Sequence, residues 1–145
     1  MISVLSALEL SEHIGKEVIS QRQLVISGSM IEAFVKISKD QQWIHQASAA
    51  PRIVPANLLI SLIPRLLQAC LEVKLFSRCL TVKYENIRFK RPVVAGDTIE
   101  LHMVLTEVRA RFDQTFVSSK VTLINVADGK DILIAKVTDC YEGSC

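Results

Sequence analysis

The sequence sets a carboxylate and an imidazole five positions apart, at Asp40 and His45, just after an amphipathic run ends. An apolar segment typical of a buried helix begins ten residues after the histidine, at Pro55. An acid, a base and a helix N-terminus with free N–H groups are the parts needed to add water to, or remove it from, a polarised carbonyl compound. We call Asp40 and His45 the acid–base pair. The other histidines, His13 and His102, lack such neighbours and are interpreted as structural.

A helix is predicted immediately before the acid–base pair. Apolar residues recur at helical spacing over residues 30–37, and either Ser27 or Ser29 can cap the N-terminus. Glu32 can complete a capping box with Ser29. Because this pattern ends near Ser38, the acid–base pair is expected in the loop that follows. A simple turn stabilised by the Asp40 side chain is the structural alternative to catalysis there.

A second helix is predicted to begin at Pro55, since proline suits the first turn of a helix. Apolar side chains cover most of its circumference up to Cys70, so this helix is expected to be buried. Pro64 predicts a kink or a break into two pieces. Phe34 and Trp43 are expected to belong to the core rather than to a ligand platform.

The second half of the chain has the composition of β-strands. Four segments combine β-formers with partial alternation: residues 80–89, 98–108, 115–126 and 132–141. Asp128 and Gly129 predict a turn between the last two, and 109–113 is a weaker turn candidate. One buried helix followed by a long antiparallel meander indicates an α+β fold, and the pattern alone allows several such folds.

Composition narrows the possible functions. A chain of 145 residues, 50% hydrophobic, is long enough for a single domain, expected over residues 1–145, with a substantial core. A net charge of +2 without a basic run argues against nucleic-acid binding. The four cysteines, which show neither CxxC spacing nor paired histidines, predict reduced thiols, with no metal and no disulfide framework. The sequence shows neither a signal peptide nor a bilayer-length apolar run, so we expect a cytoplasmic protein without membrane contact.

Three blocks resemble one known family. Residues 27–34 read Ser-Gly-Ser-Met-Ile-Glu-Ala-Phe and precede the acid–base pair; residues 53–64 read Ile-Val-Pro-Ala-Asn-Leu-Leu-Ile-Ser-Leu-Ile-Pro; and residues 87–97 contain Ile-Arg-Phe-x-x-Pro-Val-x-x-Gly-Asp. In this order they resemble the MaoC-like dehydratases, and within them the nodulation-protein-N-like branch and the R-specific enoyl-CoA hydratases. The resemblance spans about residues 18–141.

The resemblance implies a hot-dog fold, in which a curved antiparallel sheet wraps around a central apolar helix. It implies hydration of a trans-2-enoyl thioester of coenzyme A or acyl carrier protein, or the reverse dehydration, with Asp40 and His45 as catalytic residues and no cofactor. Backbone N–H groups of Ala56 and Asn57 would bind the thioester oxygen. Ser61 could face the pocket, or its hydroxyl could bond back to its own helix. A homodimer is also implied.

The chain departs from the family pattern at the helix start, where Pro55-Ala56 replaces a His-Gly pair. It also has only nine residues, 46–54, between His45 and Pro55, where the family has more. These departures leave open a non-catalytic module that binds an acyl thioester. A thioesterase is a further alternative, although the predicted helix lacks the carboxylate that hot-dog thioesterases commonly place there. The basic residues Arg88, Lys90 and Arg91 are either a solvated strand edge or a cradle for the phosphates of coenzyme A.

Overall fold

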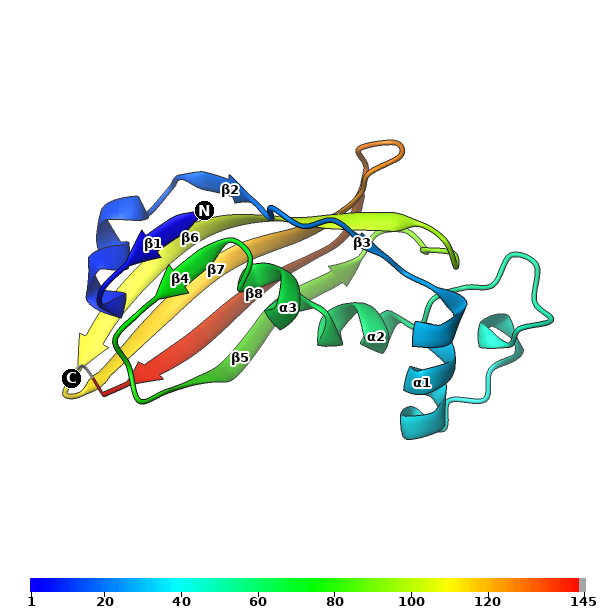
Figure 1. Cartoon of the computed structure of the whole chain (residues 1–145), viewed down its shortest axis with the longest axis horizontal. Coiled ribbons are helices and arrows are strands. Elements are labelled where there is room, and N and C mark those ends of the chain that lie inside the picture. The colour runs from blue at the N-terminus through cyan, green and yellow to red at the C-terminus, as the bar shows by residue number, and fades with distance from the viewer. Residues whose placement is uncertain (144–145) are drawn as a thin grey trace.

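Four long strands dominate the computed structural model, which describes residues 1–143 (Figure 1). They are β5 (Arg78–Phe89), β6 (Thr98–Arg111), β7 (Gln114–Asn125) and β8 (Asp131–Glu142). Their bounds fall within three residues of the predicted segments. Alternating β-branched and apolar residues favour β6, β7 and β8 because each has a set of buried side chains, whereas every residue of β5 is exposed or half-buried. The α+β class predicted from the sequence is confirmed.

The sheet follows the order β2-β6-β7-β8-β5, with β3 also paired to β6. Strands β6, β7 and β8 form an antiparallel meander, and the predicted turn at Asp128 and Gly129 is confirmed, with Gly129 in a left-handed conformation at φ 70°. The prediction that β5 continues this meander was wrong, because β5 pairs with β8 rather than with β6. Residues 90–97, which join β5 to β6, hydrogen-bond to residues 52–54 instead of forming a hairpin.

Two short helices, α2 (Ala56–Ser61) and α3 (Ile63–Leu67), lie against one face of the sheet (Figure 1). The predicted break is confirmed and falls at Leu62, just before Pro64. Most apolar side chains of both helices share one hydrophobic core with the inward-facing residues of β6 to β8; the buried ones are Leu58, Leu59, Ile63, Leu66 and Leu67. Burying a leucine or isoleucine stabilises the fold by about 1.5–3 kcal/mol, so this packing fixes where the helix start lies relative to the sheet.

The N-terminal third forms smaller elements around this core. They are β1 (Ile2–Val4), the 3₁₀ helix η1 (Ala7–His13), β2 (Glu17–Ile19) and β3 (Leu24–Val25); β4 (Leu71–Val73) follows α3 and pairs in parallel with β1. Strands of two or three residues give no periodic signal in the sequence, because they contain too few residues.

The thiols of Cys70, Cys79 and Cys140 are free, and Cys145 lies outside the described residues. Within residues 1–143, no helix is long and apolar enough to cross a membrane.

Candidate active site

Helix α1 (Gly28–Ser38) carries the chain to the acid–base pair. Its N-terminus is capped by Ser27, whose Oγ accepts a hydrogen bond from the N–H of Met30 at 3.3 Å. Glu32 does not cap this helix through Ser29 as the sequence suggested; its carboxylate lies 3.8 Å from the Arg52 guanidinium. The helix ends because Lys39 adopts a left-handed conformation, with φ 57°. This turn directs the next residue, Asp40, back toward the body of the protein.

Asp40 and His45 face one another, as their spacing predicted. The Oδ2 atom of Asp40 lies 3.5 Å from Nε2 of His45, and the Oδ1 atom accepts a hydrogen bond from the N–H of Gln42 at 3.2 Å. His45 sits in a 3₁₀ turn, η2 (Trp43–His45), and is only 6% exposed, whereas Asp40 is 34% exposed. A separation of 3.5 Å is too long for a strong direct hydrogen bond, so both atoms retain capacity to bind a third group.

The orientation of the imidazole is fixed from its other side. Nδ1 of His45 lies 2.6 Å from the carbonyl oxygen of Ile53. A carbonyl only accepts, so Nδ1 carries the proton and donates it, and in the neutral ring Nε2 is then the atom with the free lone pair. That lone pair lies on the side of Asp40. The geometry therefore places the Nε2 edge of the imidazole next to the carboxyl group of Asp40.

Arg52 holds the backbone of this turn, and it was not predicted. Its Nε donates to the carbonyl oxygen of His45 at 2.9 Å, and a Cβ added at Gly28 would come within 2.9 Å of its Nη1. The side chain therefore fills the space between α1 and η2. Gly28 was the available signal for such a contact in the sequence, because a position with no Cβ permits a close approach of another side chain. Nothing in the sequence, however, identified Arg52 as the side chain that approaches Gly28.

The acid–base pair opens onto a cavity of about 460 Å³. The start of α2 forms one wall through Ala56 and Asn57, and the end of β5 and the residues after it form another. The first N–H groups of a helix have no partner within it, so Ala56 and Asn57 offer donors at this wall. The structure thus brings together four of the five residues singled out from the sequence.

The fifth residue, Ser61, is not among the residues that line this cavity. Its Oγ donates to the carbonyl oxygen of Leu58 at 2.6 Å, which is the local hydrogen bond that the sequence left as the alternative. The prediction that Trp43 belongs to the core was wrong, since this side chain is 74% exposed. A 3₁₀ turn of three residues directs His45 inward and leaves Trp43 outside. Phe34 packs against the core as expected.

Two cations also line the cavity, Lys90 and Arg91, while Arg88 does not. Arg91 pairs with Asp128 at 3.3 Å through Nη1, and its buried Nε has no hydrogen-bond partner among the described residues. The lining of the cavity therefore combines two positive charges and the unpaired Nε of Arg91 with the acid–base pair. Such a surface attracts an anionic group such as a phosphate.

Solved structures of similar shape confirm the class of fold. The R-hydratase PhaJ1 from Pseudomonas aeruginosa is 19% identical, with a TM-score of 0.72 over 90% of this chain and 83% of that chain. An (R)-hydratase from A. caviae is 19% identical, with a TM-score of 0.66 over 87% and 94%. The HadBC 3R-hydroxyacyl-ACP dehydratase complex from Mycobacterium tuberculosis is 17% identical, with a TM-score of 0.67 over 88% and 96%. The fold is the hot-dog fold, as the resemblance implied.

A family model described as the MaoC-like domain matches residues 9–127. The chain therefore belongs to the MaoC-like dehydratase family, and the match includes the acid–base pair and both walls of the cavity. No curated protein matches the sequence.

Proposed function

We propose that this protein hydrates a trans-2-enoyl thioester, or dehydrates the corresponding 3-hydroxyacyl thioester, at the Asp40–His45 cavity. One observation carries the proposal: the free Nε2 of a buried histidine faces a carboxylate across 3.5 Å, beside a helix start with open N–H groups. A water molecule held between these two groups meets a base on one side and an acceptor on the other. The (R)-hydratase and dehydratase neighbours and the family support this reaction class.

In the hydration direction, Nε2 of His45 takes a proton from the water as the water oxygen bonds to C3 of the enoyl group. The electron pair of the double bond moves onto the thioester as an enolate-like oxygen, and C2 then takes a proton. Asp40 orients the water as a carboxylate, receives the proton that Nε2 has taken, and passes it to C2, so the net change is one added water. Because the two groups interact, their proton exchange belongs to the pair rather than to either residue.

The enolate-like oxygen needs donors, and we assign these to the N–H groups of Ala56 and Asn57. The Cβ of Ala56 stands where the family has glycine, so it crowds the approach of the thioester. Ala56→Gly removes this Cβ and should therefore raise kcat/KM on an enoyl thioester. The variant should stay folded, because glycine in the first helical turn destabilises a helix by less than the ~0.5–1 kcal/mol typical of a helix interior. Unchanged kinetics would mean that no thioester oxygen docks on these groups, or that the chain has already adjusted to the methyl group.

The carrier of the acyl group is coenzyme A or acyl carrier protein, both of which present phosphate. Lys90 and Arg91 at the cavity mouth suit such a group. The mycobacterial neighbour HadBC is a dehydratase of acyl-carrier-protein substrates, which supports the second carrier as much as the first.

We also propose that the protein is a homodimer joined along β5. Among residues 1–143, this twelve-residue strand has a neighbour on one side only, β8, and it exposes the apolar side chains of Leu80, Val82 and Phe89. An open edge of this length is a template for pairing with a second strand.

The test is to mix the purified protein with crotonyl-coenzyme A and follow the loss of enoyl absorbance and the release of free thiol in parallel. Hydration removes the enoyl signal and releases no thiol. Thiol release would favour a thioesterase, although α2 and α3 carry no carboxylate that could serve it. Binding of the thioester without loss of enoyl absorbance or release of thiol would favour the alternative function, a non-catalytic module that binds an acyl thioester. The methyl group of Ala56 and the short 46–54 segment are the features that suggest this alternative.

A further inference from the structure

A second cavity, also of about 460 Å³, lies between α3 and the strands β5 and β8. Its apolar walls include Ile63 and Leu67 of the helix and Val137 of the sheet. It lies toward the opposite end of β5 from the candidate active site, which is bounded by the last residue of that strand, Phe89. We call it the distal chamber.

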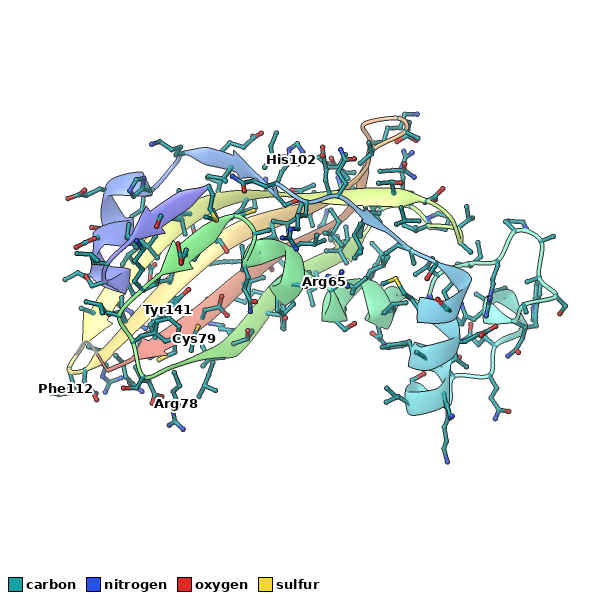
Figure 2. The ribbon with its side chains drawn as sticks, in the orientation of Figure 1. Arg65, Arg78, Cys79, His102, Phe112 and Tyr141 are labelled. Atoms are coloured by element: carbon teal, nitrogen blue, oxygen red, sulfur yellow. The ribbon has the colours of Figure 1, made fainter. Side chains whose placement is uncertain are left out.

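Four polar side chains enter the distal chamber from two neighbouring strands. Thr81 and Asp139 are direct cross-strand partners, and so are Cys79 and Tyr141. The Oγ1 of Thr81 donates to Oδ1 of Asp139 at 2.7 Å, and no hydrogen bond to Oδ2 is made within residues 1–143. Figure 2 shows Cys79 and Tyr141 close together near the end of the sheet that is far from α1. Gln68, after α3, and Glu72 of β4 also line the chamber, so it combines apolar residues with polar side chains from the helix end, from β4 and from the sheet.

The polar wall contains neutral donors and an acceptor without a cation. No lysine or arginine lines the chamber, and burial raises the pKa of the Asp139 carboxyl. Although Cys79 is exposed along much of its side chain, desolvation of the sulfur and the nearby Asp139 carboxylate raise the pKa of its thiol to about 11. Burial also raises the pKa of Tyr141. Cys79 and Tyr141 therefore remain protonated near neutral pH, and Cys79 is a hydrogen-bonding group rather than a nucleophile.

The same pair of helices connects the distal chamber to the candidate active site. Leu59 of α2 lines the active-site cavity, and Ile63 of α3 lines the chamber. Four residues of helix advance about 6 Å, so these two side chains lie roughly one turn apart. An acyl chain whose thioester docks at the start of α2 would reach the chamber only by running past the helix break at Leu62.

We propose that the distal chamber binds the far end of the acyl group and selects an acyl chain with a hydroxyl group at that end. This inference rests on the proposed function. A hydroxyl group can donate to Oδ2 of Asp139 and accept from the Tyr141 hydroxyl, and both residues line the chamber. A plain alkyl end would cover the carboxylate without giving it a partner, and a buried polar group left unpaired is strongly unfavourable. Sites built to bond a hydroxyl group reject analogues that lack it.

The experiment compares medium-chain saturated acyl-coenzyme A ligands with their ω-hydroxy counterparts of equal length, by calorimetric titration of the full chain. A hydrogen bond to a charged group corresponds to about ten- to hundred-fold in affinity, so the ω-hydroxy ligand should bind at least about ten-fold tighter at the best length. Asp139→Leu should abolish or reverse this preference, and Tyr141→Phe should reduce it while leaving the fold unchanged by thermal melting. Asp113→Asn, at the exposed β6–β7 turn, is the matched control and should keep the preference.

Equal affinity for both ligands at every length, or no binding of either, overturns the inference. A preference for an ω-amino ligand over the ω-hydroxy ligand also overturns it, because a cation would then be the favoured partner. Turnover of the unsubstituted enoyl thioester without any hydroxyl preference would leave the proposed function intact and remove this inference. A preference for the ω-hydroxy ligand in binding, without turnover of any enoyl thioester, would support this inference and contradict the proposed function.

Discussion

The acid–base pair can be tested by two substitutions that remove chemistry and keep hydrogen bonds. Asp40→Asn keeps an oxygen that can accept from the N–H of Gln42, and it removes the negative charge beside Nε2. His45→Asn places an amide nitrogen close to the position of Nδ1, so it can still donate to the carbonyl of Ile53. It removes Nε2, the atom proposed as the base. His45→Ala would instead leave that carbonyl without its partner and confuse stability with catalysis.

The expected losses of stability and activity differ greatly in size. Asp40 is partly exposed, so losing its charge should lower the free energy of unfolding by about 0–1 kcal/mol. His45 is buried, and His45→Asn should lower it by about 1–3 kcal/mol, less than the ~5–15 kcal/mol that holds a typical domain together. Each variant should nevertheless lose about 10²–10⁴-fold in kcat, the usual contribution of a positioned acid or base.

The assay is the initial rate of crotonyl-coenzyme A hydration, with thermal melting of each variant measured in the same buffer. Both variants should remain folded at the assay temperature. If either keeps a rate within a few-fold of the wild type, the assigned role of that residue is wrong. Equal losses in a double variant and in the single variants would indicate that the two residues act as one unit.

Three further outcomes are expected. Arg52→Met keeps the aliphatic stem but loses the hydrogen bond to the His45 carbonyl. The kcat should therefore fall by up to about 10²-fold while the affinity for substrate changes little, which rates at several substrate concentrations would measure. Val82→Asp should convert the dimer into a monomer, as measured by light scattering. The control Ile37→Asp changes an apolar side chain of α1 that is even more exposed, and it should leave the mass unchanged. A wild-type monomer at micromolar concentration would contradict the dimer itself. A hydrogen bond from His102 holds the pKa of the Glu100 carboxyl below its ordinary value of 4.5, so this bond stabilises the fold above that pH and the benefit is lost as the pH falls through the lowered value. Glu100→Gln should therefore lower the melting temperature near pH 7, by an amount equivalent to about 1 kcal/mol or less, and the difference should disappear at pH values below the lowered pKa; a difference that persists there would refute the linkage.

Some of the site was readable because it depends on neighbours in the sequence. Asp40 and His45 are close enough along the chain that one helix end and one short turn bring them together. The start of α2 was readable from Pro55, and the break near Pro64 from the geometry of proline. The strand segments β5 to β8 were readable because a side chain alternates between two faces whatever the rest of the fold does.

Other features depend on contacts between distant residues, and no local pattern encodes them. The pairing of β5 with β8 was mispredicted, because the connection through residues 90–97 forms backbone hydrogen bonds with Ile26, Arg52, Val54 and Ile132 instead of a hairpin. The exposure of Trp43 was also mispredicted, since the direction of a side chain in a 3₁₀ turn follows from what the turn packs against.

The sequence by itself determined the α+β class of fold, the proximity of Asp40 and His45, and the family that these residues resemble. Only the tertiary structure decided which atom of His45 is free, because the carbonyl that holds Nδ1 lies eight residues away. It alone brought Arg52 to the backbone of His45 and set Thr81 beside Asp139, two residues 58 positions apart. Local patterns report periodicity and turn chemistry, whereas hydrogen bonds of this kind exist only after the chain has folded around its core.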